Sequence, residues 1–278
     1  MNLHDKTQVL IEALPYIKKF NSKIVVIKFG GNAMPKMENV IEDIVLLKHM
    51  GLKPVVVHGG GPEIDSELIK AKIKPKFVSG LRYTDEFVIK IVEKVFKKLN
   101  REIVSNISSH GAKSANASGC IKSNQKDLSL GLVGNITGVN EKKILKLLNL
   151  GFIPVISPIG IGDGGKKYNL NADTAASSVA VALKAEKLTI LTNVDGIIIG
   201  NKILPHIDMH TARNEIKKGN ISRGMIPKVE ACIYAVQNKC PKAHLINGLV
   251  PHSLLLEIFT DKGIGTEIVF KNGYEKNN

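Results

Sequence analysis

The stretch KIVVIKFGG, residues 23–31, decides the fold class of this chain of 278 residues. Its β-branched and apolar residues, closed by two glycines, predict a strand that is buried on both faces and ends in a tight turn. The same pattern returns in VVVHGGGP, residues 55–62, where Pro62 suits the first turn of a following helix. Between them, residues 38–49 have helical spacing, and Gly51 is placed to end that helix. Strands that alternate with helices predict an α/β fold with a mostly parallel sheet.

The rest of the chain continues this alternation as a single domain, without a low-complexity linker or an internal repeat. Thr84 is a candidate N-cap for a helix that ends near Leu99, and residues 112–137 predict hairpins that cover one edge of the sheet. We expect the two halves of the chain to share one continuous sheet. The other predicted helices cover residues 3–19, 171–184, 225–238 and 253–259, and the other predicted strands cover residues 152–157, 187–191, 243–246 and 266–270.

The chain is basic, with 39 Lys and Arg against 25 Asp and Glu and a formal net charge of +14. The lysines are spread along the chain, and aromatic residues make up only 5% with no Trp, which argues against a nucleic-acid interface. No stretch has the ~18 apolar residues of a membrane span, and the first residues lack the apolar segment of a secretory signal. We therefore expect an intracellular protein that binds neither nucleic acid nor membranes.

The cysteines and histidines do not form a metal-binding pattern. Cys120, Cys232 and Cys240 contain no C-x-x-C pair, and their odd number favours reduced thiols that pack in the core. His206 and His210 have i, i+4 spacing, but no Glu follows His206 as a zinc-protease helix requires. We therefore predict no metal site built from protein side chains.

Glycine-rich turns follow the first two strands. Gly30-Gly31 and Gly59-Gly60-Gly61 lie at the carboxyl edge of the sheet, where α/β proteins bind ligands and helix N-termini attract phosphate. Neither turn is part of a Walker-A motif, which the chain lacks, and no G-x-S-x-G nucleophile elbow occurs. A G-x-G-x-x-G string at Gly160, Gly162 and Gly165 lacks the helix that a dinucleotide site needs, so we interpret it as a hairpin.

Three charged residues stand where an apolar element meets a turn. Lys28 lies in an otherwise apolar strand, where a charge is costly unless it meets a partner or points into a site. Asp173 opens an Ala-rich helix, and Lys228 opens the helix that follows Pro227. Each also has a structural explanation, because strand-end lysines reach solvent and aspartates favour helix N-termini. Composition and spacing leave both explanations open.

Five motifs, in this order, resemble the amino-acid kinase family and, within it, the acetylglutamate kinases, over essentially the whole chain. They are VIKFGGNA at 26–33, VHGGGP at 57–62, GLRYTD at 80–85, NLNAD at 169–173 and GMIPKV at 224–229. The resemblance implies a three-layer α/β/α sandwich. It also implies an enzyme that transfers the γ-phosphate of ATP to the side-chain carboxylate of N-acetyl-L-glutamate in arginine biosynthesis.

The resemblance also implies a role for each matching residue. Lys28 and Lys228 flank the transferring phosphoryl group, and Asp173 holds the two lysines in place. Because a carboxylate nucleophile needs no general base, alignment and charge neutralisation suffice, with Mg²⁺ on the ATP phosphates. Arg82 clamps the α-carboxylate of the acetylated amino acid, with Asn169 beside it. Glycine N–H groups bind phosphate oxygens and the incoming carboxylate, and they come from Gly30, Gly31, Gly60 and Gly61.

By the same resemblance, the domain divides into an acetylglutamate-binding lobe over about residues 23–185, preceded by the helix 3–19, and a nucleotide-binding lobe over about residues 186–278. The implied ATP-binding residues of the second lobe are Thr192, Asn193, Gly196, Gly224 and Met225. Asn193 and Asn247 stand where Asp is usual in the family, Arg223 where Gly is usual, and Leu249 where Arg is usual. Asn193 and Arg223 fall in the nucleotide site, which allows for an altered nucleotide affinity.

The resemblance extends to arginine-inhibited, hexameric members of the family. The N-terminal helix resembles theirs, and the tail from residue 252 to residue 266 resembles their arginine site, with His244, Glu257 and Gly263 as implied contacts. A cationic inhibitor needs a carboxylate, which Glu257 can supply, although a solvated Glu257 on a packing helix is the alternative. The implied assembly is a homohexamer, the implied location is the cytoplasm or a plastid stroma, and a PII signalling protein is a candidate partner.

Two other functions remain open. A sister kinase of the same family would act on glutamate, aspartate, carbamate or UMP, and Arg82 within GLRYTD argues against these substrates. A non-catalytic arginine sensor or partner-binding subunit would keep the fold without the activity, and Asn193 and Arg223 are the two positions that favour it.

Overall fold

The computed structural model describes residues 3–31, 37–200, 202–260 and 263–271, so positions 32–33 of the first motif lie outside the described residues. Its centre is an eight-stranded sheet in the order β14-β16-β15-β11-β1-β2-β8-β5. Neighbouring strands pair in parallel except β15 with β16, which confirms the mostly parallel α/β prediction. The strands are β1 Ile24–Phe29, β2 Lys53–His58, β5 Ser114–Asn116, β8 Ile153–Ile156, β11 Lys187–Thr192, β14 His206–Asp208, β15 Lys242–Asn247 and β16 Thr266–Val269.

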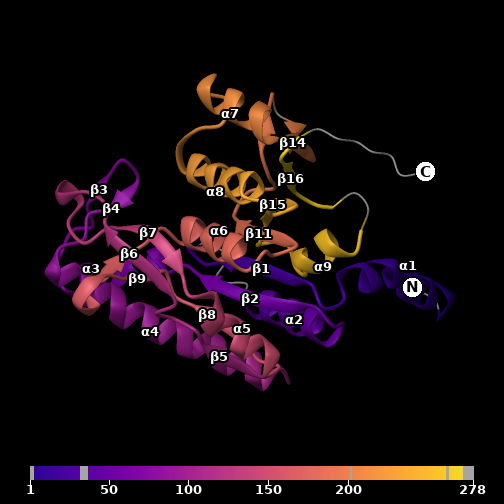
Figure 1. Cartoon of the computed structure of the whole chain (residues 1–278). Helices are drawn as coiled ribbons and strands as arrows, with labels where there is room; N and C mark the ends of the chain where they lie inside the picture. The colour runs from indigo at the N-terminus through magenta and orange to yellow at the C-terminus, as the bar shows by residue number, and fades with distance from the viewer. Residues whose placement is uncertain (1–2, 32–36, 201, 261–262, 272–278) are drawn as a thin grey trace.

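Helices cover both faces of this sheet (Figure 1). Side chains alternate along each strand, so Val26 of β1 packs in a core with α6 and α8, whereas Val25 and Ile27 pack in a core with α2 and α9. The result is the three-layer α/β/α sandwich that the resemblance implied. The helices are α1 Leu3–Phe20, α2 Met37–His49, α3 Gly61–Lys70, α4 Glu86–Ser109, α5 Glu141–Asn149, α6 Ala172–Ala182, α7 Met209–Lys217, α8 Ile226–Gln237 and α9 Ser253–Ile258.

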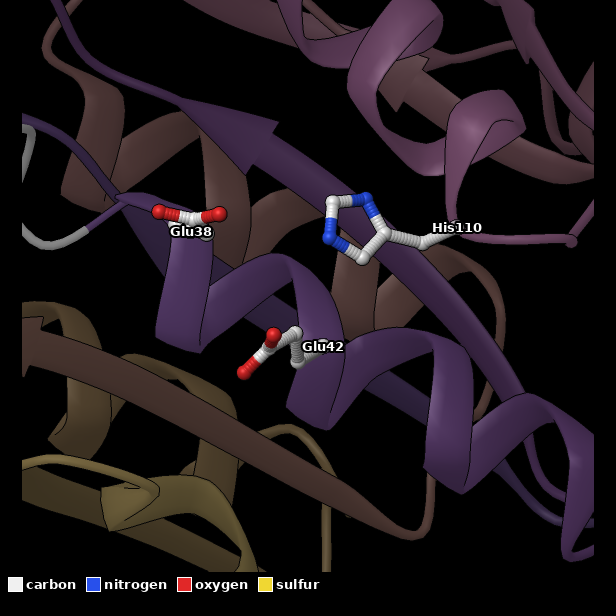
Figure 2. Close-up of side chains that lie close together, drawn as sticks. All are labelled: Glu38, Glu42 and His110. Atoms are coloured by element: carbon white, nitrogen blue, oxygen red, sulfur yellow. The ribbon is translucent and has the colours of Figure 1, made fainter.

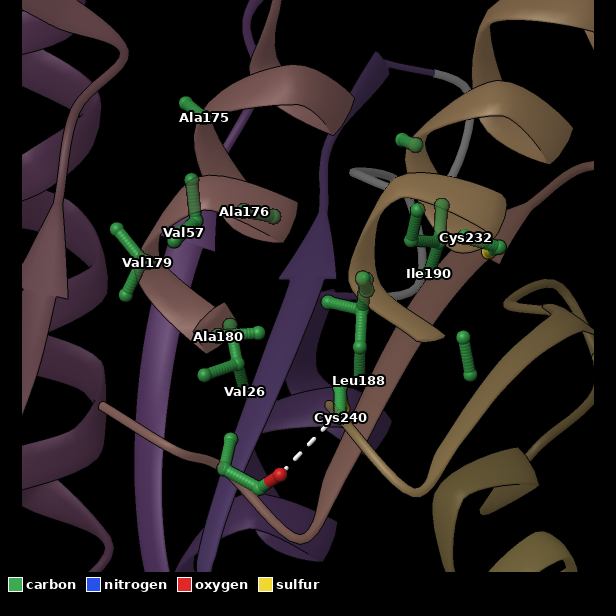
Figure 3. Close-up of a cluster of buried hydrophobic side chains, with 14 of the residues drawn as sticks. Val26, Val57, Ala175, Ala176, Val179, Ala180, Leu188, Ile190, Cys232 and Cys240 are labelled. Carbon is green, nitrogen blue, oxygen red and sulfur yellow. Dashed lines mark hydrogen bonds between the residues drawn. The ribbon is translucent and has the colours of Figure 1, made fainter. Parts of the chain in front are cut away.

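The small side chains of α6 let this helix pack closely on α8 and on the sheet (Figure 3). Ala175 and Ala180 are fully buried there. Cys232 and Cys240 lie in the same core, where burial raises the pKa of both thiols, to about 11 for Cys240. Cys120 is also buried and free, so the prediction of cysteines as reduced thiols that pack in the core is confirmed.

A second sheet, in the order β10-β9-β6-β7, lies at one end of the molecule. The G-x-G-x-x-G string spans β9 and the turn before its antiparallel partner β10, so it forms a hairpin as predicted. The hairpin prediction for residues 112–137 is right for β6 with β7 but wrong for β5, which pairs in parallel with β8 in the central sheet. The small strands are β3 Phe77–Val78, β4 Leu81–Arg82, β6 Ile121–Gln125, β7 Gly134–Val139, β9 Ile159–Ile161, β10 Lys167–Asn169, β12 Ile198–Ile199 and β13 Lys202–Ile203.

The helix α4 differs from its prediction at both ends. Its N-cap is Asp85, whose carboxylate accepts two N–H groups of the first turn at 2.9 and 2.8 Å. Thr84, the predicted cap, instead donates its hydroxyl to the carbonyl oxygen of Arg82 at 2.8 Å. The helix continues past Leu99 to Ser109 because its buried apolar face continues.

The helix α1 keeps Pro15 within its length and packs on the molecule through its carboxyl end. The rings of Tyr16 and Phe259 meet edge to face with centroids 6.4 Å apart, while Ile11 and Leu14 stay 58% and 46% exposed. In the described part of the chain, no helix combines the length and the apolar character needed to cross a lipid bilayer.

Candidate active site

Three adjacent parallel strands, β11, β1 and β2, end beside one cavity of about 330 Å³. Ligands bind at the carboxyl edge of an open α/β sheet, where the connecting loops diverge. The cavity brings together most of the residues that the sequence singled out, and those that line it are Lys28, Gly30, Gly31, Gly60, Gly61, Arg82, Asn169, Asp173, Thr192, Asn193 and Lys228.

Asp173 joins Lys28 and Lys228 inside this cavity. It stands in the first turn of α6, where the N-cap Asn171 accepts its N–H at 2.9 Å. Lys28 Nζ, from β1, lies 2.8 Å from one carboxylate oxygen, and Lys228, from α8, donates to the other oxygen at 2.8 Å. Lys28 is 7% exposed and Asp173 is 4% exposed. A buried charge is stable only when it is paired, so this contact explains how Lys28 can occupy an apolar strand.

Two ammonium groups around one carboxylate leave an excess of positive charge. Burial alone would raise the pKa of Asp173, but Lys28 and Lys228 outweigh it and bring that pKa to about 2. Burial lowers the pKa of Lys28, and Lys228 adds to this effect while Asp173 opposes it. Asp173 is therefore ionised with both oxygens engaged, which suits it to hold lysines and not to accept a proton. The remaining positive charge attracts anions.

The turns after β1 and β2 touch each other. A Cβ atom on Gly30 would lie 2.5 Å from the backbone nitrogen of Gly59, and Gly30 and Gly31 have φ values of +148° and +59° that favour glycine. The second turn leads directly into α3. Among the described residues, none accepts the N–H of Gly60 or Gly61, so these donors remain for an anion.

Arg82 and Asn169 are linked to each other through Thr84. Asn169 donates to the Thr84 hydroxyl at 3.1 Å, and that hydroxyl donates to the Arg82 carbonyl oxygen. The guanidinium of Arg82 pairs with Asp65 on α3 and donates to the Gly61 carbonyl oxygen at 3.2 Å. Sequence reasoning missed Asp65 and the role of Thr84. Asp65 carried a weak signal, because it follows Gly61 by one helical turn and so shares its face of α3.

Three predicted nucleotide residues do not line the cavity: Gly196, Gly224 and Met225. Gly196 packs against β16, where an added Cβ would lie 2.6 Å from Thr266 Oγ1. Gly224 and Met225 belong to a short 3₁₀ helix, Arg223–Met225, just before α8. Thr192 and Asn193, at the end of β11, do line the cavity.

The predicted arginine contacts form a separate buried group around Glu257. Its carboxylate touches His244 Nδ1, lies 3.9 Å from Lys187 Nζ, and accepts the Ile264 N–H at 3.0 Å. Burial alone would raise the pKa of Glu257, but His244 and Lys187 outweigh it and lower that pKa. Gly263, with φ +59°, lies so close that a Cβ there would be 2.7 Å from Glu257 Oε2. The sequence did not indicate that Lys187 joins this group.

A further set of side chains could bind a metal ion. Glu38 and Glu42 on α2 and His110 at the end of α4 place one ligand atom each within 4.8 Å of one another (Figure 2). Both carboxylates are exposed, and none of the three residues lines the cavity. The sequence pattern did not indicate this set, because its members lie far apart in the chain.

The Asp173→Asn variant should be less stable by about 3–5 kcal/mol, because it leaves the buried ammonium group of Lys28 and the partly buried one of Lys228 without a counter-charge. The pKa of Asp173 in the folded protein, about 2, lies below its value in the unfolded chain. The carboxylate therefore stabilises the fold above pH ~4, and this contribution is lost as the pH falls towards 2. In urea unfolding, the free energies of unfolding of the wild type and of Asp173→Asn should differ by about 1 kcal/mol less at pH 3 than at pH 6.

The exposed Asp163, in a turn of the second sheet, provides the matched control. Asp163→Asn should change stability by less than about 0.5 kcal/mol at either pH. A difference between the wild type and Asp173→Asn that stays constant from pH 6 to pH 3 would contradict the ion-pair assignment.

The sequence and the fold both have close relatives. The model of the amino acid kinase family matches residues 23–247. Acetylglutamate kinases from Thermoanaerobacter pseudethanolicus and Caldanaerobacter subterraneus subsp. tengcongensis are 52% and 51% identical, over 95% of this chain and 93% of each relative. The solved N-acetylglutamate synthase from Neisseria gonorrhoeae, complexed with coenzyme A and N-acetyl-glutamate, has a TM-score of 0.87 at 24% identity. That match covers 96% of this chain and 64% of the synthase chain, and it shows a shared fold. The chain therefore belongs to the amino-acid kinase family, within its group of acetylglutamate kinases.

Proposed function

We propose that this protein transfers the γ-phosphate of ATP to the side-chain carboxylate of N-acetyl-L-glutamate and forms N-acetyl-L-glutamyl 5-phosphate in arginine biosynthesis. The observation that carries the proposal is the ion-paired group of Lys28, Asp173 and Lys228 in the cavity. Relatives that share about half of their residues with this chain are acetylglutamate kinases, which supports the choice of acceptor.

The proposed reaction needs no general base to activate the acceptor. A carboxylate attacks phosphorus without losing a proton, so the reaction needs in-line alignment and neutralisation of the charge on the transferred group. In the proposed complex, Lys28 and Lys228 bind oxygens of the transferring phosphoryl group from β1 and α8, while Asp173 keeps both lysines in place. The N–H groups of Gly31, Gly60 and Gly61 add donors, and Gly30 permits the close approach of the two turns.

Arg82 and Asn169 suit the amino-acid end of the acceptor. A guanidinium binds a carboxylate with two parallel hydrogen bonds, and Arg82 is oriented for this by Asp65. Asn169 is linked to Arg82 by hydrogen bonds through the Thr84 hydroxyl. In the proposal, acetylglutamate binds the lobe of residues 23–185 and ATP binds the lobe of residues 186–278, where Gly196, Gly224 and Met225 complete the nucleotide site. The lobes meet where β1 pairs with β11.

Mg²⁺ enters the proposal together with ATP. The described residues that line the cavity offer one carboxylate, Asp173, and two lysines already hold it. Mg²⁺ usually takes few protein ligands and keeps phosphate and water oxygens, so an ion carried by the triphosphate fits this lining, to which Thr192 and Asn193 contribute side-chain oxygen atoms. Bound there, it would add positive charge at the phosphates.

Purified protein with ATP, Mg²⁺ and N-acetyl-L-glutamate should form an acyl phosphate, which hydroxylamine traps as a coloured hydroxamate. The reaction should be lost with glutamate, aspartate, carbamate or UMP as acceptor, because these lack the acetylated α-amino group or the amino-acid end. An absence of product at saturating substrate, with arginine binding retained, would favour the arginine-sensor alternative and contradict the kinase.

The Arg82→Gln variant should raise the KM for N-acetyl-L-glutamate by roughly 10- to 100-fold, which corresponds to the loss of a charge-assisted hydrogen bond. The KM for ATP should stay within about threefold, because Arg82 lies on the acceptor side. Arg101 is an exposed arginine on α4, and Arg101→Gln is the matched control with unchanged constants. An equal rise of both KM values in Arg82→Gln would contradict the clamp.

The proposal includes feedback inhibition by arginine at Glu257, His244 and Gly263. The carboxylate of Glu257 already faces two basic side chains in a buried setting. A guanidinium offers the same charge with more hydrogen-bond donors, so an arginine that entered could replace the contact with Lys187. None of these three residues lines the cavity, so inhibition would be allosteric.

The Glu257→Gln variant should weaken arginine binding by at least about 10-fold in calorimetry, because a charged hydrogen bond is replaced by a neutral one. The kcat measured without arginine should change by less than about threefold. Glu230→Gln, an exposed glutamate on α8, serves as the control. Arginine affinity that is unchanged in Glu257→Gln would remove this residue from the site.

The proposal also covers the oligomeric state of the protein and its location in the cell. The exposed Ile11 and Leu14 on α1 are consistent with a contact between subunits, and a homohexamer is the proposed state. The proposed location is the cytoplasm, or a plastid stroma if the gene is carried by an organelle, and a PII signalling protein is a candidate partner. Light scattering of the purified protein would distinguish the hexamer from smaller species.

A further inference from the structure

His58 is a fully buried histidine that the chemistry described so far does not use. It is the last residue of β2 and directly precedes the glycine turn. Its Nδ1 lies 2.9 Å from the carbonyl oxygen of Gly59. Because a carbonyl oxygen only accepts hydrogen bonds, Nδ1 carries the proton and donates it to Gly59.

The other ring nitrogen is held by a buried polar network. With Nδ1 protonated, Nε2 of a neutral ring accepts, and Ser157 Oγ lies 2.9 Å away as its donor. Ser157 in turn accepts from the Ser118 hydroxyl at 3.0 Å, and Asn100 on α4 donates to the Val155 carbonyl oxygen at 3.1 Å beside them. The network therefore fixes both the tautomer and the position of the ring.

The ring stays neutral near pH 7. Burial lowers the pKa of His58 to about 4, and the hydrogen bond to Gly59 opposes this only in part. The charged groups of the cavity are Lys28, Lys228, Arg82 and Asp173, and none of them is a partner of the ring. A neutral histidine with a fixed tautomer acts here as a hydrogen-bond donor of constant direction.

We propose that His58 is a positioning residue, which holds the peptide between Gly59 and Gly60 so that the Gly60 N–H faces the cavity. In a planar trans peptide the C=O and N–H groups point in opposite directions, so anchoring the Gly59 oxygen towards His58 turns the Gly60 N–H away from it. Gly59 and Gly60 line the cavity and His58 does not. The inference rests on the proposed function, in which the Gly60 N–H binds an oxygen of the reacting groups.

The anchor matters because this peptide lies between two glycines. Glycine adopts positive and negative φ with little cost, so the peptide can rotate unless something restrains it. Rotation would turn the Gly59 carbonyl oxygen towards the lysines of the cavity, where it would accept hydrogen bonds from them and repel an anion. The turn is already held on its other side, since the Gly59 N–H donates to the Phe29 carbonyl oxygen at 2.8 Å. His58 completes the restraint.

Two amide substitutions separate the positioning role from a packing role. His58→Asn places an amide nitrogen near the position of Nδ1 and can still donate to Gly59, whereas His58→Gln places it near Nε2 and serves only the network. We expect kcat for acyl-phosphate formation within about threefold of the wild type in His58→Asn. In His58→Gln we expect kcat to fall by about 10²-fold, the usual effect of one lost oxyanion donor, with the KM for ATP changed by less than about threefold.

Ser157→Ala is the comparison for the network. It removes the nearer of two partners of Nε2, leaves Asn100 Nδ2 at 3.4 Å as the other, and leaves Nδ1 with Gly59. It should therefore lower the melting temperature while kcat stays within about threefold. Equal losses of kcat in His58→Asn and His58→Gln, or a larger loss in His58→Asn, would overturn the positioning role.

Crystal structures of the two variants provide a readout that does not depend on activity. The Gly59 carbonyl should keep its direction in His58→Asn and rotate in His58→Gln, and an unrotated peptide in His58→Gln would also overturn the inference. Failure of the wild-type protein to form any acyl phosphate would instead reject the proposed function.

Discussion

One buried carboxylate shared by two lysines is the constraint on which the rest of the structure depends. Removing each charge from water costs several kcal/mol, so Lys28 in β1 requires Asp173 from α6, and Lys228 from α8 takes the second oxygen. These contacts link the first turns of α6 and α8 to β1 of the sheet. They also leave the cavity with more positive than negative charge, which a triphosphate and a carboxylate can balance. The same three side chains therefore pair the buried charges and supply positive charge for the substrates.

Much of the fold was predictable because its signals are local. The runs that became β1 and β2 are apolar on both faces, since each packs against helices on both sides, and a glycine turn follows each of them. The prediction failed where the outcome depends on tertiary contacts. Thr84 and Asp85 are both good caps, and Thr84 is used instead to bind Arg82. Residues 114–116 have no strong strand pattern, and they join the central sheet because β8 offers a free edge.

The candidate site was predictable in part. Composition could not decide the role of Lys28, Asp173 and Lys228, but the resemblance named all three, and the structure places each lysine 2.8 Å from a carboxylate oxygen of Asp173. Asp65, Lys187 and the polar network around His58 were missed, because their partners are distant in the chain and no spacing rule connects them. Their contribution is to orient groups that the sequence did identify. The tertiary structure explains why Gly30 is a glycine, because its backbone lies too close to that of Gly59 for a Cβ atom.

The most direct test of the central claim is a crystal structure of the protein with ADP, Mg²⁺, tetrafluoroaluminate and N-acetyl-L-glutamate. Tetrafluoroaluminate imitates the phosphoryl group in transfer. The analogue should lie between the acceptor carboxylate and ADP, within hydrogen-bond distance of the Nζ atoms of both Lys28 and Lys228, while Asp173 still contacts both lysines. A complex in which either lysine points away from the analogue, or in which Asp173 leaves the lysines, would contradict the central claim.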